Sequence, residues 1–434
     1  MGYKGIALKL LEAAKVEIGS NVKITSDRKT FEGILIPRYE LADDEHIVIK
    51  LRNGYNIGIK VTSIAKLEKI GEGPKPAFVS PPIPTDKPRL PTVSIISTGG
   101  TIASRIDYRT GAVHSALSAH DLYSVVPELS EIANVETKIL FSLFSENIRA
   151  IHWSKLAEEI VTCIEDGVRG VVVCHGTDTM AYTSAALSFA LQNLPIPIIL
   201  VGSQRSSDRP SSDAAVNLTN AVTSAVSIPI AEVMVGMHDS VSDTSTVLHR
   251  GTKTRKCHTS RRDAFKSINV SPLAKIEEKN ISILTEEYVK RDPKRKLVLN
   301  SKFEEKVALV KFYAGFNPEI IDWYVNEDYY GLVLEGTGLG HVGNNLFSHI
   351  RDAVNHGLLV GMTSQCIWGR VNMNVYDTGI DLQEIGVIPL EDMLPETALV
   401  KMMWVFGQTK NVHKAQRLLK TNIANEFSKR TIYL

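Results

Sequence analysis

The chain has 434 residues, 44% of them hydrophobic and 22% charged, which is typical of a folded protein with two or three domains. Lysine and arginine number 49 and aspartate and glutamate 48, so the overall charge does not favour a protein that coats nucleic acid. The four cysteines are scattered, which argues against a disulfide framework or a zinc site. Without a signal peptide or a run of about 18 apolar residues, we expect a cytoplasmic protein that does not span a membrane.

The first 75 residues predict a small domain of their own. Residues 1–15 have the pattern of a short helix, with apolar side chains available for burial at Ile6, Leu8, Leu10 and Leu11. Strand-length segments follow at residues 21–25, 30–36, 46–51, 56–61 and 63–70. Because Asn53-Gly54 is a strong hairpin signal and the strands are short, we expect a small closed barrel of the SH3-like kind.

Residues 71–91 contain seven prolines and lack apolar periodicity. Such a segment is typical of an extended linker, which we place at residues 76–91.

From residue 92 onward, the pattern predicts an α/β architecture. Runs rich in valine and isoleucine at residues 93–97, 170–174, 198–202 and 230–235 predict buried parallel strands. Helical patterns lie between them at residues 151–166 and 214–227, which indicates a doubly wound domain over residues 92–290. Further apolar runs at residues 307–312, 330–334 and 357–362 predict a second α/β domain over residues 305–434. The charged segment 292–302 suits a connection or flap.

The first motif with chemical content is STGGTIAS, residues 97–104, directly after a predicted strand. Ligands of open α/β sheets bind beyond the carboxyl ends of the strands. The glycines let the backbone approach a ligand closely, and the threonine hydroxyls can bind or attack a substrate. The same residues also fit a simple Gly-Gly turn with threonine caps, so the motif alone leaves both interpretations open.

Two further segments carry candidate residues. Thr177 and Asp178 follow the strand at residues 170–174, where an acid beside a hydroxyl could hold an ammonium group, although Asp178 also fits a helix N-cap. Lys256 could act as a base if nearby cations or burial lowered its pKa, although the sequence alone favours a solvated basic loop. The cations available in the sequence are Arg255, Arg261 and Arg262. A thiol–imidazole pair of Cys257 and His258 is disfavoured because adjacent side chains in an extended segment point to opposite sides.

A glycine-rich stretch at residues 338–343, GLGHVG, matches the dinucleotide fingerprint G-x-G-x-x-G. That fingerprint also requires an acidic residue about 20 positions later, at the end of the next strand. Residues 359–365 read LVGMTSQ and contain no acid, so we reject a nicotinamide site here.

Four motifs in order resemble the bacterial-type L-asparaginase family from about residue 92 to the C-terminus. They are STGGTIAS, CHGTDTM (174–180), IILVGSQRSSDRPSSDAAVNL (198–218) and KCHTSRRDAFKS (256–267). The resemblance implies that Thr101 is the nucleophile and that Tyr108 closes over the substrate and polarises Thr101. It implies a second triad of Thr177, Asp178 and Lys256, in which Lys256 is the base and Asp178 also binds the substrate α-amino group.

The same resemblance places the remaining substrate contacts. Ser145 and Glu146, in the sequence SENI, match the family's loop for the substrate carboxylate, although the family has Gln or Glu at the second position. Backbone N–H groups near Gly99, Gly100 and Gly176 could stabilise the oxyanion, so Gly100 and Gly176 are expected in the substrate site. No metal or cofactor is implied for this chain.

About ninety residues precede the asparaginase-like part, and this extension resembles the family of D subunits of archaeal glutamyl-tRNA(Gln) amidotransferases. The resemblance implies a homodimeric glutaminase that hydrolyses glutamine. Its ammonia would pass to a separate E subunit that amidates Glu-tRNA(Gln) with ATP and Mg²⁺. A free-standing L-asparaginase or glutaminase is the nearest alternative, a nicotinamide-dependent oxidoreductase a distant one, and a tRNA-binding barrel the last.

Overall fold

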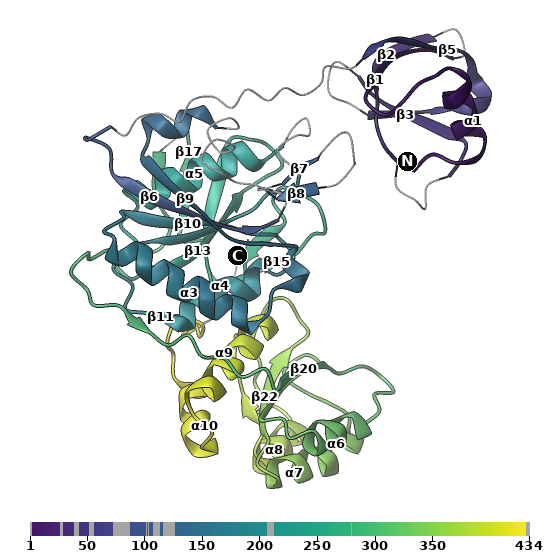
Figure 1. The fold of residues 1–434 in the computed structure, drawn as a ribbon. Helices are drawn as coiled ribbons and strands as arrows, with labels where there is room; N and C mark the ends of the chain where they lie inside the picture. Colours follow the sequence, from purple (N-terminus) through teal and green to yellow (C-terminus); the bar gives the residue numbers. More distant parts are fainter. Residues whose placement is uncertain are drawn as a thin grey trace.

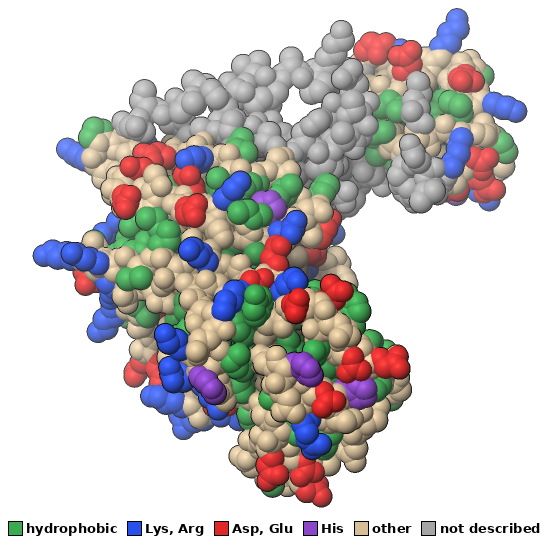
Figure 2. Space-filling view, turned by 60° about the horizontal axis from the view of Figure 1, so that its bottom comes forward, with side chains coloured by type: hydrophobic (Ala, Val, Ile, Leu, Met, Phe, Trp, Pro, Cys, Tyr) green, Lys and Arg blue, Asp and Glu red, His purple; other side chains and the backbone are tan. Residues whose placement is uncertain are grey.

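The computed structural model describes residues 2–26, 29–38, 43–51, 56–72, 87–100, 102, 104–106, 113–115, 126–205, 212–278 and 280–430. They form a small N-terminal unit and two α/β units, with the N-terminal unit at the upper right of Figure 1. Acidic and basic side chains both lie on the face drawn in Figure 2, in keeping with a net charge of +1. None of the described helices is long and apolar enough to cross a membrane.

The N-terminal unit is one antiparallel sheet in the order β4-β3-β2-β1-β5, packed against helix α1 (Gly5–Ala13). Its strands are β1 (Ser20–Ser26), β2 (Lys29–Leu35), β3 (His46–Leu51), β4 (Asn56–Lys60) and β5 (Ile64–Glu72), with the 3-10 turn η1 (Val61–Ser63) between the last two. The predicted strands are therefore present. Within residues 2–26, 29–38, 43–51 and 56–72 no ladder joins β4 to β5, so the predicted closure of the barrel is not seen there.

Alternate residues of β1 and β3 build the core of this unit, because successive strand side chains point to opposite faces. Val22, Ile24, Ile47 and Ile49 are fully buried. Leu11 of α1 joins this core, but Ile6 is 55% exposed, so its predicted burial was wrong. The tip of the predicted hairpin, Asn53-Gly54, and residues 73–86 of the linker region lie outside the described residues.

The first α/β unit contains an eight-stranded sheet in the order β18-β17-β14-β13-β12-β10-β6-β9. Its parallel strands are β6 (Thr92–Gly99), β9 (Asn134–Leu143), β10 (Gly170–Cys174), β12 (Ile198–Val201) and β13 (Val233–His238). The antiparallel part, which was not predicted, consists of β14 (Ser245–Arg250), β17 (Ala274–Glu277) and β18 (Asn280–Ile283). Strand β13 begins three residues later than predicted, because Ile230 instead makes an isolated bridge with Lys290.

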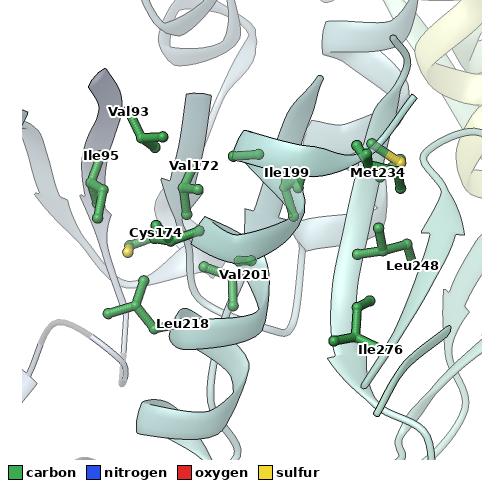
Figure 3. Packing of buried hydrophobic residues seen from close by; sticks show 14 of the residues in the cluster. Val93, Ile95, Val172, Cys174, Ile199, Val201, Leu218, Met234, Leu248 and Ile276 are labelled. Atoms are coloured by element: carbon green, nitrogen blue, oxygen red, sulfur yellow. The ribbon is translucent and has the colours of Figure 1, made fainter. Parts of the chain in front are cut away.

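Helices cover both faces of this sheet, as expected for a doubly wound fold. On one face, α5 (Ala214–Ser227) packs through Leu218 on side chains that include Val93, Val172 and Ile199 (Figure 3). On the other face, α3 (Ala150–Glu165) and α4 (Met180–Ala190) cover the intervening strand residues, such as Val171 and Val173. Short elements connect these layers: β7 (Ser104–Ile106), β8 (Val113–Ser115), η3 (Pro127–Glu131), η4 (Ser145–Asn147), β15 (Thr254–Lys256) and β16 (Phe265–Ser267).

The second α/β unit has a parallel four-stranded sheet in the order β20-β21-β22-β23. Its strands are β20 (Val307–Lys311), β21 (Gly331–Gly336), β22 (Leu359–Ser364) and β23 (Ile388–Pro389). Its helical elements are α6 (Glu319–Asn326), η5 (Asn344–Leu346), α7 (Phe347–Asn355), α8 (Asp377–Ile385), α9 (Pro395–Gln408) and α10 (Val412–Lys420). The connecting segment 292–302 contains β19 (Val298–Leu299), which pairs with β11 (Leu191–Gln192) of the first unit.

The two α/β units share a buried interface centred on α4 and α9 (Figure 1). Phe189 of α4 and Trp404 of α9 lie with ring centroids 6.0 Å apart in one hydrophobic cluster. The segment after α10 returns to this interface, where Glu426 forms an ion pair with Lys401 and both side chains are fully buried. Since buried charges persist only when they are paired, this contact ties the C-terminal segment to α9.

Candidate active site

The loops after β6 and β10 emerge side by side at one edge of the sheet. The two strands are parallel neighbours with Ser97 opposite Cys174, so their carboxyl ends coincide. The Thr98 hydroxyl donates a hydrogen bond to the Cys174 carbonyl over 3.0 Å, which joins the two strand ends directly. The sequence motifs at residues 97–104 and 174–180 therefore begin at the same place, as the α/β pattern predicts.

Gly100 packs against the backbone of Gly176, which brings the two motifs into contact. A Cβ atom on Gly100 would lie 2.5 Å from the Gly176 nitrogen, and its φ of +82° is itself unfavourable for other residues. A Cβ on Gly176 would lie 2.7 Å from the Cβ of Ser145. The glycines therefore permit three segments to meet, including the η4 turn that carries Ser145.

Ser145 is 4% exposed and packs beside Gly176. Its carbonyl accepts a hydrogen bond from the Thr179 hydroxyl over 2.7 Å, so η4 is fixed to the loop after β10. Glu146 follows on the same turn and is exposed. The structure thus brings Ser145, Gly100 and Gly176 together, while Glu146 lies at the surface beside them.

Lys256 joins this site from the short hairpin of β15 and β16. Its Nζ atom lies 2.8 Å from Thr177 Oγ1 and 2.7 Å from Asp178 Oδ1. The Lys256 side chain is 13% exposed, whereas that of Asp178 is 69% exposed. The interpretation of Lys256 as a solvated loop lysine was therefore wrong. So was that of Asp178 as an N-cap, because α4 begins after Thr179 and has no side-chain cap.

Each of the three arginines near Lys256 in the sequence has a carboxylate partner. The pairs are Arg255 with Glu396 (3.1 Å), Arg261 with Asp263 (2.9 Å) and Arg262 with Asp243 (2.5 Å). Their charges are therefore balanced locally by acids.

Cys257 and His258 do not form a thiol–imidazole pair. His258 Nδ1 accepts hydrogen bonds from the backbone N–H groups of Ser260 and Arg261, each over 3.0 Å. The Cys257 sulfur instead lies 3.6 Å from the Arg255 carbonyl oxygen. The two side chains thus have separate local partners, in agreement with the sequence argument.

His175 supports the turn that carries Thr177, and sequence reasoning assigned it no role. Its Nδ1 lies 2.7 Å from the Gly176 carbonyl oxygen, which can only accept, so Nδ1 carries the proton. Its Nε2 then accepts from the Thr183 hydroxyl over 2.9 Å, and Trp153 donates to that hydroxyl over 3.1 Å. Burial lowers the pKa of His175 to about 4, which keeps the ring neutral at neutral pH. The ring therefore fixes the peptide group between Gly176 and Thr177.

Thr101 and Tyr108, the nucleophile and the closing residue implied by the resemblance, lie outside the described residues. The residues flanking Thr101 are described: Gly100 contacts Gly176, and Ile102 is 5% exposed. The glycine-rich stretch 338–343 follows β21 in the second unit and forms a tight turn in which Gly340 and His341 donate to the Thr337 carbonyl. Across the described ranges, no group of three or more His, Cys, Asp or Glu side chains could hold a metal ion.

Comparison with known proteins identifies the family. The profile of the asparaginase N-terminal domain matches residues 92–288, that of the glutaminase/asparaginase C-terminal domain residues 306–419, and that of the GatD N-terminal domain residues 16–70. The D subunit of the glutamyl-tRNA(Gln) amidotransferase from Methanothermobacter thermautotrophicus is 50% identical over 432 residues, covering 99% of this chain and 98% of the relative. The corresponding D subunit from Pyrococcus abyssi is 51% identical over 426 residues, 97% of each chain.

The chain belongs to the family of D subunits of glutamyl-tRNA(Gln) amidotransferases. The solved structures it resembles include the thermostable L-asparaginase from Thermococcus kodakarensis, with a TM-score of 0.72 and 30% identity over 78% of this chain and 100% of that one. L-asparaginase I from Vibrio cholerae gives a TM-score of 0.69 and 29% identity over 78% and 99%.

Membership of this D-subunit family confirms the family and class predicted from the sequence, an amidohydrolase component of a tRNA-dependent amidotransferase. The asparaginase-like fold of two α/β units with a small N-terminal sheet domain is confirmed as well. The domain boundaries and the roles of individual site residues stay predictions.

Proposed function

We propose that this member of the D-subunit family hydrolyses glutamine to glutamate and ammonia at the site of Thr177, Asp178 and Lys256. The observation that carries this proposal is the contact of one lysine with both a hydroxyl and a carboxylate, at 2.8 and 2.7 Å. Amide hydrolysis requires a hydroxyl nucleophile, a base to take its proton and a group that orients the substrate. All three kinds of group are present at the edge of the sheet where ligands of α/β folds bind.

The chemistry assigns a step to each residue. Lys256, in its uncharged form, accepts the proton of the attacking threonine, Thr101 or Thr177, as that same oxygen bonds to the side-chain carbonyl carbon of glutamine. The carbon–nitrogen bond breaks, the nitrogen leaves as ammonia with the transferred proton, and water hydrolyses the resulting ester to glutamate. Thr101, which directly follows Gly100 in the sequence, is the nucleophile that the family resemblance implies, and Tyr108 is proposed to close over the substrate and polarise Thr101. Backbone N–H groups beside Gly100 and Gly176 would stabilise the oxyanion.

Asp178 is proposed to bind the α-amino group of the substrate. Its carboxylate contacts Lys256 through Oδ1, and its side chain is 69% exposed, so it can also receive a second cation. Ser145 and Glu146 would contact the substrate carboxylate from η4, with the buried Ser145 the better fixed of the two. This arrangement would orient the amide toward the threonines.

We further propose that the ammonia serves a partner, the E subunit of the amidotransferase, which amidates Glu-tRNA(Gln). The relatives are named as subunits of a glutamyl-tRNA(Gln) amidotransferase, and this supports a multi-subunit assembly. A homodimer of this chain with one E subunit on each copy is the proposed assembly. ATP and Mg²⁺ are assigned to the E subunit, and no cofactor is assigned to this chain.

A free-standing L-asparaginase is the second candidate, because the similar solved structures are named as L-asparaginases. The match of the GatD N-terminal domain to residues 16–70 favours the amidotransferase component. The test is ammonia release from glutamine and from asparagine, with and without the E subunit, ATP and Glu-tRNA(Gln). Release from glutamine that rises with the partner supports the proposal, whereas no release under any condition refutes it. Release from asparagine alone, indifferent to the partner, supports the second candidate.

A further inference from the structure

The segment that leads into the strand of Lys256, together with Arg255 of that strand, is attached to the second α/β unit. Three successive contacts connect the segment 252–255 with the segment 392–397. They are the Thr397 hydroxyl to the Thr252 carbonyl (2.9 Å), Lys253 Nζ to Asp392 Oδ2 (2.8 Å) and Arg255 Nε to Glu396 Oε1 (3.1 Å). The strand therefore lies in one unit but is held by the other.

Arg255 and Lys256 lie on opposite sides of β15 and contact different units. Neighbouring side chains of a strand point to opposite faces. Lys256 contacts Thr177 and Asp178 of the first unit, while Arg255 contacts Glu396 at the start of α9 in the second. Because the two residues are consecutive, a displacement of the backbone at Arg255 would also displace Lys256.

Glu396 is suited to fix Arg255. Its side chain is 12% exposed, and its Oε1 atom forms an ion pair with Arg255 Nε at 3.1 Å. Its other oxygen, Oε2, is buried and has no hydrogen-bond partner among the described residues. Tyr182 of α4 lies in the same surroundings, where burial, with a smaller contribution from Glu396, raises its pKa to about 12. With so little solvent around it, the carboxylate has little freedom to leave the guanidinium.

We propose that Glu396 is a positioning residue that acts through Arg255 to hold Lys256 Nζ against Thr177 and Asp178. The kinetic part of this inference rests on the proposed glutaminase function, whereas the geometric part does not. The second α/β unit thereby determines the placement of the proposed base, although Thr177, Asp178 and Lys256 all belong to the first.

The test compares Glu396→Ala and Glu396→Gln with a matched control, Glu305→Ala. Glu305 also pairs with an arginine across the two units, Arg149 at 2.6 Å, but this pair is exposed and distant in the chain from β15. Two readouts are measured: the rate at which Lys256 is acetylated by dilute acetic anhydride, followed by mass spectrometry, and kcat and KM for glutamine hydrolysis. Thermal unfolding of each variant establishes that it is folded.

In Glu396→Ala we expect Lys256 acetylation to accelerate several-fold and kcat to fall about ten- to hundredfold with KM nearly unchanged, as for a catalytic group displaced by up to about 1 Å. Glu396→Gln, whose amide oxygen can still accept from Arg255, restores most of both values. Glu305→Ala behaves as the wild type.

Unchanged acetylation in folded Glu396→Ala, or an equal change in Glu305→Ala, overturns the positioning role. If the wild type releases no ammonia while acetylation still distinguishes the two variants as expected, the proposed function fails and the positioning role stands.

Discussion

Replacing Lys256 by methionine removes the terminal amino group and keeps the length of the side-chain stem. The variant loses both short contacts, 2.8 Å to Thr177 and 2.7 Å to Asp178. Loss of a general base lowers kcat by about 10²–10⁴, which is a barrier increase of about 3–5 kcal/mol. The effect on stability is far smaller, because Asp178 is 69% exposed and such ion pairs contribute at most about 1 kcal/mol. We expect Tm to fall by no more than about 2–4 °C.

The assay is ammonia release from glutamine under saturating conditions, with thermal unfolding measured in parallel. Lys266→Met is the matched control, since Lys266 lies on the partner strand of the same hairpin and pairs instead with Asp263 at 3.1 Å. It should keep kcat within about twofold of the wild type, as expected for a residue outside the reaction. Retention of more than about a tenth of kcat in Lys256→Met would refute the assignment of Lys256 as the base.

Three further predictions concern the surroundings of the site. Gly100→Ala places a Cβ 2.5 Å from the Gly176 nitrogen, so glutamine hydrolysis should fall at least about hundredfold, measured as ammonia release from a variant with wild-type circular dichroism. Burial lowers the pKa of His175 from 6.5 to about 4, so the unfolded chain binds more protons than the folded one. Stability should therefore decline as the pH falls from about 6.5 to about 4, by up to about 3 kcal/mol for this residue, and urea unfolding of His175→Asn should show a flatter pH profile. Lys253→Met leaves the buried Asp392 carboxylate without its cation and should cost about 3–5 kcal/mol in urea unfolding, part of which Asp392→Leu in the same chain restores.

The sequence predicted four of the five parallel strands of the eight-stranded sheet, β6, β10, β12 and β13, because these read as runs of mostly apolar residues. The fifth, the edge strand β9, contains no buried residue and was not predicted. β10 and β12 are completely buried, and both were found within one residue. By contrast, β18 is mostly exposed and β14 is buried despite its serine, threonine, histidine and arginine, so neither has a recognisable pattern. Ile6 fitted a helical period but faces solvent, because periodicity alone does not determine which side of a short helix is covered.

Less of the candidate site than of the fold could be predicted from the sequence. Thr177 and Asp178 are 79 and 78 positions from Lys256, and no local signal joins residues so far apart. Only the resemblance to asparaginases grouped them, and the geometry now places them in contact. No pattern in the sequence indicated that His175 supports the turn before Thr177, since a histidine after a buried strand fits many roles. The ion pair between Arg255 of β15 and Glu396 of α9 joins two units, so the sequence pattern of neither unit predicts it.

The return of the C-terminal segment to the interface has a consequence for the order of folding during synthesis. Lys401 is fully buried, and its carboxylate partner Glu426 is translated later. Asp392, which pairs with Lys253, likewise accepts from the backbone N–H of Ser428 over 2.9 Å. Since an uncompensated buried charge is strongly unfavourable, the two α/β units cannot dock fully before this segment leaves the ribosome. The strand with Lys256 therefore reaches its final place only after Glu426 and Ser428 have been translated, which would keep shorter nascent chains from hydrolysing glutamine.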